Sequence, residues 1–247
     1  MKLTNYLRHT CVYTTYIYLF KNDYWQRVRA IREFYRPFVR KNSLVFDIGA
    51  NRGIHSKCLL DLGARVVAVE PHPANLERLR EFPATRSGKL TVLPIALSDE
   101  HGPAEMHIGE VTDFSTLSPE WLEIAQNSER FSEHSWSQTI TVLTATLDTL
   151  IRVYGRPDFI KIDVEGFESQ VLDGLSSIPC PMMFEFNSEW MEKALECIHK
   201  PCFPAEEVEF NYAVQSKVML KRWVCREELA GLLTGVAGDV LVRRKRA

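Results

Sequence analysis

The sequence predicts an α/β fold, a mostly parallel sheet of seven strands with helices on both faces. Short apolar runs such as residues 43–47 and 65–70 are typical of strands buried on both faces. Helical patterns follow them at about residues 54–62 and 73–82, and such alternation favours a parallel sheet. Further strands are expected at residues 90–95, 158–163, 181–186, within 208–214 and at 238–243, and further helices at residues 147–154, 168–174, 188–199 and 226–233.

The regular alternation is preceded by an N-terminal segment and interrupted by an insertion. Residues 1–40 should be mainly helical and form a cap within the same domain as residues 41–247. The aromatic residues of these helices could pack on the domain or join two copies of the chain in a homodimer. The insertion at residues 102–139 lies between the third and fourth strands. It should contain a strand at 104–108, a helix at 119–125 and polar loops, with a further strand at 139–145. We expect it on the ligand side of the sheet, supplying part of an acceptor pocket.

Composition narrows the class of protein. The chain has 247 residues, 45% of them hydrophobic and 25% charged, which is ordinary for a globular domain. Its formal net charge of -2 gives no overall basic field for nucleic acid. The six cysteines form no C-x-x-C pair, and no stretch predicts a signal peptide or a stable membrane insertion. We therefore expect a cytoplasmic protein with reduced thiols.

A glycine-containing turn after the first strand predicts a nucleoside-binding site. Gly49 and Gly53 allow a sharp turn and a close approach of a ligand, and Glu70 ends the second strand, where an acid can bond ribose hydroxyls. The pattern is not G-x-G-x-x-G, so a pyrophosphate fits poorly. Asp47 stands just before the turn and suits a cationic ligand. This chemistry favours S-adenosylmethionine (SAM), a sulfonium, over NAD.

Four segments in this order resemble the FkbM family of SAM-dependent methyltransferases: residues 47–53, 70–71, 147–148 and 159–168. The resemblance extends from about Leu44 to Glu185. It implies a Rossmann-like class I methyltransferase fold that uses SAM and releases S-adenosylhomocysteine. It also implies O-methylation of a hydroxyl on a sugar or natural-product small molecule.

The resemblance also assigns residues to SAM. Glu70 would bind the ribose hydroxyls, Ala96 and Leu97 would flank the adenine, and Ser115 is a weaker candidate in the insertion. The full set of expected SAM-binding residues is Asp47, Gly49, Ala50, Asn51, Gly53, Glu70, Pro71, Ala96, Leu97, Ser115 and Asp163.

Three residues are candidates for the catalytic base. Asp163 and Glu165 follow the fourth strand and could bind the cation of SAM, take a proton from a hydroxyl, or cap the next helix. We expect their side chains to point in different directions and to do different jobs. His55 is the third candidate, or merely a polar residue in a first helical turn. Lys161 should be buried, either in a structural ion pair with Asp163, Asp47 or Glu185, or positioning an active-site carboxylate.

Some alternatives remain open. Asp163, Glu165 and Glu185 could hold Mg²⁺ through their oxygens, but no spacing demands it and no metal is expected. The same SAM site could serve an N- or carboxyl-methyltransferase, or a non-catalytic SAM-fold binding subunit. The expected partner is a small-molecule hydroxyl acceptor, not nucleic acid.

Overall fold

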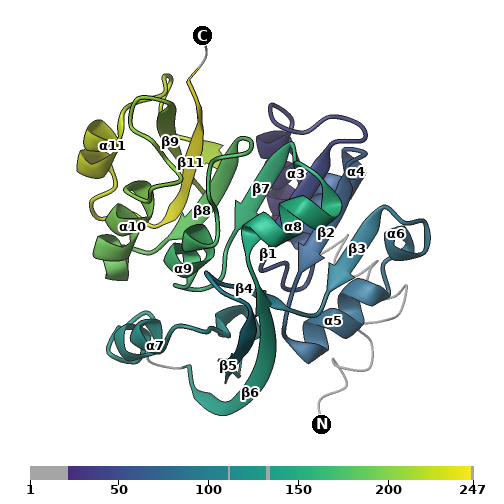
Figure 1. Cartoon of the computed structure of the whole chain (residues 1–247). Helices are drawn as coiled ribbons and strands as arrows, with labels where there is room; N and C mark the ends of the chain where they lie inside the picture. The colour runs from purple at the N-terminus through teal and green to yellow at the C-terminus, as the bar shows by residue number, and fades with distance from the viewer. Residues whose placement is uncertain (1–21, 111, 132–133, 246–247) are drawn as a thin grey trace.

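The central sheet has eight strands in the order β10-β9-β11-β8-β7-β1-β2-β3 (Figure 1). The computed structural model describes residues 22–110, 112–131 and 134–245. Neighbours from β3 to β8 run parallel, whereas β11 lies antiparallel between β8 and β9. The strands of this sheet are β1 (Leu44–Ile48), β2 (Arg65–Val69), β3 (Leu90–Leu93), β7 (Phe159–Ile162), β8 (Met182–Phe186), β9 (Val208–Val214), β10 (Lys217–Val218) and β11 (Gly238–Arg244).

Helices cover both faces of this sheet. One apolar core packs α3 and α4 against one face, and a second core packs α8, α9, α10 and α11 against the other. β1 is buried at all five positions because it lies between these two layers. The helices are α3 (Asn22–Tyr35), α4 (Ile54–Asp61), α5 (Pro73–Arg80), α6 (Pro83–Arg86), α7 (Pro119–Gln126), α8 (Leu147–Tyr154), α9 (Glu168–Asp173), α10 (Met191–Ile198) and α11 (Arg226–Leu232), with 3-10 turns η1 (Thr112–Phe114) and η2 (Ser188–Trp190).

The predicted α/β fold with its mostly parallel sheet is confirmed, with a different strand count. The extra strand is β10, which pairs antiparallel with β9. Gln215 and Ser216 join the two strands, both with positive φ, as in a two-residue hairpin turn. Asn-Gly and Asp-Gly signal such a turn in a sequence, and Gln-Ser does not. The expectation of seven strands was therefore wrong by one short strand.

The insertion forms a second sheet of three strands in the order β4-β6-β5. Ala96 and Leu97 lie beyond the strand expected at residues 90–95, and as β4 (Ala96–Leu97) they pair in parallel with Thr144 and Ala145. β5 (Gly102–Gly109) and β6 (Trp136–Ala145) form a long antiparallel ribbon. β6 begins three residues earlier than predicted, because Trp136 lies opposite Gly109 and its Nε1 donates to a carbonyl of η1 at 2.6 Å.

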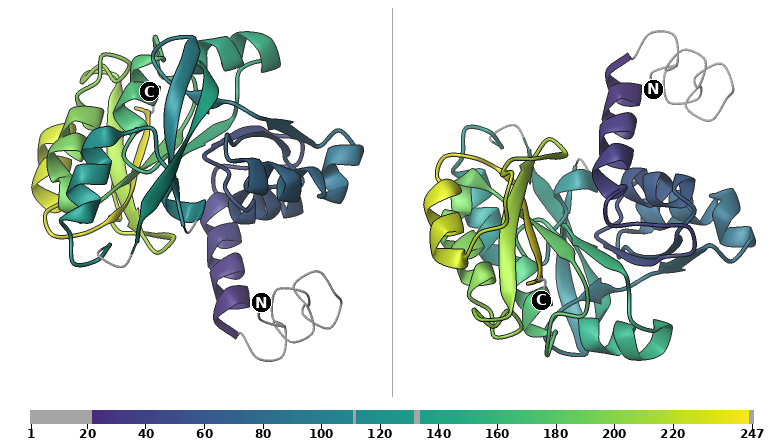
Figure 2. Two further views of the ribbon diagram at one scale, coloured as in Figure 1. Left: turned by 90° about the horizontal axis from the view of Figure 1, so that it is seen from below. Right: turned by 90° about the horizontal axis from the view of Figure 1, so that it is seen from above.

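The described part of the expected N-terminal cap is α3, since residues 1–21 lie outside the described residues. Val28, Ile31 and Tyr35 are buried, and α3 packs mainly on α4. The N-terminal end of α3 projects beyond the body of the molecule (Figure 2). The proposed homodimer through the N-terminal helices stays a prediction.

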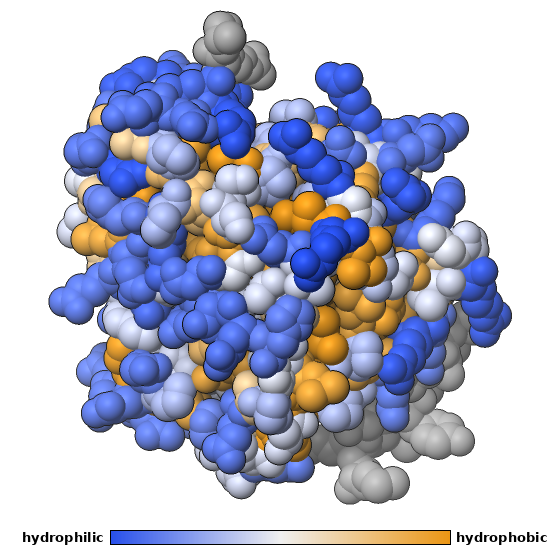
Figure 3. Space-filling model, viewed as in Figure 1, coloured by the Kyte–Doolittle hydropathy of each residue, from blue (hydrophilic) through white to orange (hydrophobic). Residues whose placement is uncertain are grey.

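The surface is mainly hydrophilic on the face seen in Figure 3, with apolar residues gathered near its centre, beside α8. Val153 of α8 is 64% exposed. Within the described ranges, no helix combines the length and apolar character needed to cross a membrane.

Candidate functional site

An open hollow of about 600 Å³ lies at the carboxyl ends of β1, β2 and β7. The strand order reverses between β1 and β7, and parallel α/β sheets bind ligands at this kind of switch point. The lining residues are Ile48, Gly49, Asn51, Val69, Glu70, Pro71, Ala96, Leu97, Met106, Thr112, Ser115, Leu117, Asp163, Val164, Glu165 and Phe167. The hollow therefore joins two distant parts of the sequence, the central strand ends and the insertion.

The turn after β1 approaches the end of β7 very closely. Gly49 has φ +71°, and a Cβ there would lie 1.8 Å from the carbonyl oxygen of Asp163. Gly53, with φ +79°, serves helix packing instead, since its Cβ would lie 2.7 Å from Leu79 of α5. Ala50 is buried, 3% exposed, within the same turn. Of these predicted residues, Gly49 is the one placed against the hollow.

Glu70 lies in the floor of the hollow, directly after β2. Its two oxygens accept hydrogen bonds from the backbone N–H groups of Asn51 at 2.6 Å and His72 at 2.7 Å. Burial raises the pKa of Glu70, although these hydrogen bonds oppose the rise. Glu70 therefore fixes the shape of the turn, and each carboxylate oxygen can still accept a further bond. Asn51 Oδ1 is buried in the hollow without a hydrogen-bond partner among the described residues.

A buried lysine connects the acids beneath the hollow. Lys161 Nζ lies 3.4 Å from Asp47 Oδ1 and 3.2 Å from Asp163 Oδ2, and it donates to the carbonyl oxygen of Gly49 at 2.8 Å. Burial lowers the pKa of Lys161, but Asp163 and Asp47 outweigh burial and raise the pKa overall. Asp47 is fully buried beneath the turn and also accepts from Ser56 at 2.6 Å. The structural ion pair is therefore observed, with Asp47 and Asp163 as partners. Because Asp163 lines the hollow, the positioning role stays a prediction.

The turn between β7 and α9 is held in an unusual conformation. Glu165 has φ +54°, a left-handed value that is unusual for a residue with a side chain. Thr116 Oγ1 of the insertion donates to the Glu165 carbonyl at 2.7 Å, and Glu168 accepts from Val164 N at 2.8 Å. Burial raises the pKa of Glu168 to about 7. Glu168 therefore holds the turn that precedes α9.

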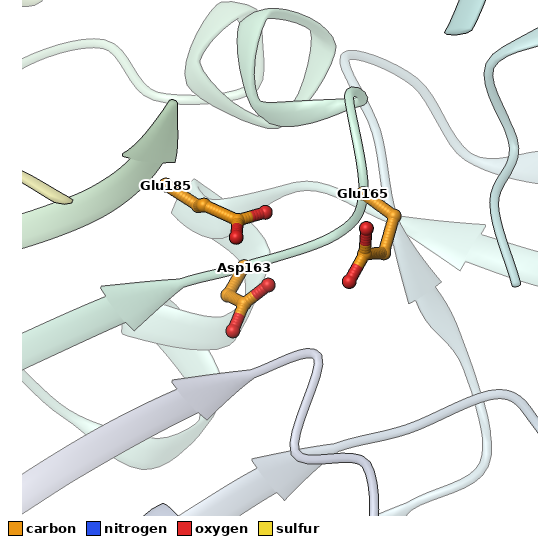
Figure 4. A group of neighbouring side chains, drawn as sticks. All are labelled: Asp163, Glu165 and Glu185. Atoms are coloured by element: carbon orange, nitrogen blue, oxygen red, sulfur yellow. The ribbon is translucent and has the colours of Figure 1, made fainter. Parts of the chain in front are cut away.

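Three carboxylates meet at the edge of the hollow. Oxygens of Asp163, Glu165 and Glu185 all lie within 4.8 Å of one another. Figure 4 shows them turned toward a common space, from the end of β7, the following turn and β8. The expectation that Asp163 and Glu165 point in different directions was wrong, because the left-handed backbone at Glu165 turns its side chain back toward Asp163. Burial, and then the charges of Asp163 and Glu165, raise the pKa of Glu185 well above its usual value.

His55 lies outside the hollow, in the first turn of α4. Its Nδ1 is 2.7 Å from the hydroxyl oxygen of Tyr35, which belongs to α3. Burial lowers the pKa of His55 to about 3, so the ring is neutral at pH 7. This placement favours a structural link between α3 and α4 over a role as base.

The insertion supplies one wall of the hollow. Ala96 and Leu97 reach it from β4, and Ser115 lies in the loop after η1, where its Oγ accepts from Gly109 N at 3.2 Å. Met106 and Thr112 also line this wall and were not predicted. The inward alternation of β5 could have indicated Met106, since it is buried between more exposed neighbours. No local pattern marks Thr112.

Comparisons with known proteins agree with this geometry. A family model described as the methyltransferase FkbM domain matches residues 47–216. The hexuronic acid methyltransferase AglP of Haloferax volcanii is 29% identical over 139 residues. That match covers 56% of this chain and 52% of the relative, so the chain spans about half the length of this curated protein.

Solved structures give more distant matches. A precorrin-6y C5,15-methyltransferase from Geobacter metallireducens has a TM-score of 0.43 at 12% identity, covering 89% of this chain and 87% of that one. A ribosomal protein L11 methylase from Lactobacillus delbrueckii has a TM-score of 0.45 at 13% identity, covering 90% and 80%. Nothing about the substrate follows from matches at this level.

Proposed function

This chain belongs to the FkbM methyltransferase family, and from that premise we propose that it transfers a methyl group from SAM to a hydroxyl of a sugar or natural-product small molecule. The observation that carries the proposal is the hollow at the switch point. It combines a glycine turn packed against the end of β7, an acid after β2 and three converging carboxylates. The sugar acceptor is supported by the hexuronic acid methyltransferase relative.

The residues of the hollow fit SAM chemically. SAM carries a sulfonium and an ammonium, and carboxylates with an unpaired amide oxygen are suitable partners for such cations. Asn51 Oδ1 and Asp163 provide these groups, while Glu70 is placed for hydroxyl groups. The apolar side chains of Val69 and Leu97 suit a flat aromatic base. When bound, SAM supplies an activated methyl carbon, so the protein mainly needs to align the acceptor.

A hydroxyl acceptor needs a group that can take its proton. Carboxylates placed beside the hollow can do this. Asp163 and Glu165 line the hollow, and Glu185 lies beside them. This need favours a hydroxyl over a carboxyl acceptor, which carries no proton to remove at pH 7.

Two measurements test the proposal. Calorimetry should give micromolar binding of SAM and of S-adenosylhomocysteine, with no binding of NAD. Methyl transfer from labelled SAM should then be measured to glucuronic acid, glucose, an aliphatic amine and acetate. Binding of neither nucleoside would refute the donor site and favour a non-catalytic subunit. Labelling of the amine or of acetate alone would leave the donor site intact and replace the hydroxyl acceptor.

We also propose a small-molecule partner and a cytoplasmic location. The net charge of -2 supports a partner other than nucleic acid. The described cysteines are free thiols, and four of them are buried, which supports a reducing compartment. No metal is part of the proposal, although oxygens of the carboxylate group would be suitable Mg²⁺ ligands. Activity after dialysis against EDTA tests that point.

A further inference from the structure

Thr116 is a fully buried polar residue of the insertion, and it does not line the hollow. Its backbone pairs with that of His107 in β5. His107 N donates to the Thr116 carbonyl oxygen at 2.8 Å, and Thr116 N donates to the His107 carbonyl oxygen at 3.0 Å. These two bonds fix Thr116 to the ribbon of β5 and β6, so its side chain is presented from a rigid element.

The hydroxyl of Thr116 joins the insertion to the turn after β7. Thr116 Oγ1 accepts a hydrogen bond from Ser118 N at 2.9 Å and donates to the carbonyl oxygen of Glu165 at 2.7 Å. A hydroxyl has one hydrogen to donate, and the bond to Glu165 uses it. This contact therefore links two segments that lie 49 residues apart in the sequence.

The residue that this bond holds has an unfavourable backbone conformation. Glu165 has φ +54°, and Gly166 after it has φ +86°. Trp121 of α7 packs against the same turn, since a Cβ on Gly166 would lie 2.7 Å from it. A glutamate released from these contacts would favour an ordinary backbone with negative φ, which directs its Cβ elsewhere. The direction of the Glu165 side chain therefore depends on the insertion.

The direction of this side chain matters because Glu165 lines the hollow. Its carboxylate has an oxygen within 4.8 Å of oxygens of Asp163 and Glu185 (Figure 4). Asp163 has its own support, since Lys161 Nζ lies 3.2 Å from its carboxylate. A carboxylate binds a hydroxyl only over a narrow range of distances, and a misplacement of about 1 Å at a reacting group can cost about 10²-fold in rate.

Resting on the proposed function, we propose that Thr116 is a positioning residue of the methyl-transfer site. By holding the backbone of Glu165, it places the Glu165 carboxylate to accept the hydrogen bond of the acceptor hydroxyl. Thr116 itself touches neither the donor nor the acceptor. The insertion then contributes to the rate as well as to the shape of the hollow. A purely structural role for Thr116 would change the stability of the fold and leave the rate of the folded protein unchanged.

The variant Thr116→Val removes the hydroxyl and keeps the shape of the side chain. Methyl transfer is measured to glucuronic acid or glucose, whichever the wild type labels. Thr116→Val should lower kcat by about tenfold or more, while the KM for SAM and the affinity for S-adenosylhomocysteine stay within about threefold. Thr116→Ser restores the hydroxyl and should return kcat to within about threefold of the wild type. Wild-type kcat in folded Thr116→Val overturns the proposal, and so does an equal loss in Thr116→Ser.

The matched control is Thr144→Val. Thr144 is another buried threonine of the insertion sheet, and its hydroxyl donates to the carbonyl oxygen of Glu100 at 2.8 Å. Thr144 does not line the hollow. Thr144→Val should lower the unfolding temperature by an amount similar to that of Thr116→Val, with kcat within about threefold of the wild type. Equal losses of kcat in the two valine variants would show a general loss of structure and overturn the positioning role.

Hydrogen exchange in a peptide covering residues 163–168 tests the contact without turnover. Exchange should be faster in Thr116→Val than in the wild type and unchanged in Thr144→Val, and unchanged exchange in both overturns the proposal. Thr116→Ala takes the place of Thr116→Val if the latter does not fold, because its smaller side chain avoids crowding at the buried position. A wild type that methylates no hydroxyl compound refutes the proposed function. A wild type that does so, with an unaffected Thr116→Val, refutes this inference alone.

Discussion

Replacing Lys161 by methionine tests how the charges beneath the site are balanced. Lys161 is 2% exposed and its ammonium contacts Asp47, which is fully buried, and Asp163. Methionine keeps much of the side-chain length and removes the charge and the three donors. Asp47 would then hold a buried negative charge, with Ser56 as its remaining hydrogen-bond partner among the described residues.

The expected cost follows from this burial. Removing one partner of a buried ion pair costs about 3–5 kcal/mol, because the other charge is left uncompensated. Lys200→Met is the matched control. Lys200 also contacts two acids, Asp173 at 2.7 Å and Glu196 at 2.8 Å. Those side chains are 43% and 46% exposed, so water replaces the lost contact and the cost should be about 0–1 kcal/mol.

Urea unfolding followed by circular dichroism measures both variants against the wild type. Lys161→Met should lower the free energy of unfolding by at least about 2 kcal/mol more than Lys200→Met, with a similar m value. Adding Asp47→Asn to Lys161→Met should recover about 1 kcal/mol or more, because a neutral amide needs no cation. Equal losses in the two lysine variants would refute the proposed balance of charges.

Three further predictions concern single residues. Glu70→Ala should weaken SAM binding by roughly 1.5–3 kcal/mol in calorimetry, and unchanged affinity in the folded variant would show that Glu70 is not in the donor site. Gly49→Ala should destabilise the protein far more than Gly88→Ala, as thermal unfolding will show. Both glycines have φ near +70°, but a Cβ at Gly49 would collide with the backbone and one at Gly88 would meet nothing within 4 Å, so equal costs would contradict the geometry. Burial raises the pKa of Asp239 to about 7 in the folded protein, whereas the pKa of an aspartate in the unfolded chain is about 3.9. The stability that Asp239 contributes is therefore present near pH 4 and is lost as the pH rises through about 7. The free energy of unfolding of Asp239→Asn, relative to that of the wild type, should therefore be higher at pH 8 than at pH 4 by about 1 kcal/mol or more. The same difference between variant and wild type at both pH values would contradict the buried acid.

The central strands could be predicted from the sequence because they are buried on both faces. In β1, β2 and β7 every position but the first of β2 is buried, so each appears as a short apolar run that ends at an acid or a turn. Those ends meet at the switch point. Placing the hollow there therefore needed only the order of the strands and the glycine turn that follows β1.

The parts that could not be predicted depend on contacts between distant segments. Ala96 and Leu97 form a strand only because β6 pairs with them, and their own sequence is equally compatible with a turn. The partner of His55 is Tyr35 of another helix, so no local pattern distinguished a structural role from a catalytic one. Trp121 of α7 and Trp190 of η2 likewise stack on each other, and no spacing along the chain signals that pair.

The insertion has a structural role at the site besides lining it. Glu165 adopts a left-handed backbone that costs a residue with a Cβ about 1–2 kcal/mol. Two contacts from the insertion hold it there: Thr116 binds its carbonyl, and Trp121 packs so closely that a Cβ on Gly166 would lie 2.7 Å from it. Strain of this kind persists where the surroundings over-determine a conformation. Here that conformation brings the Glu165 carboxylate to Asp163 and Glu185, so the insertion helps to assemble these carboxylates and also forms one wall of the hollow.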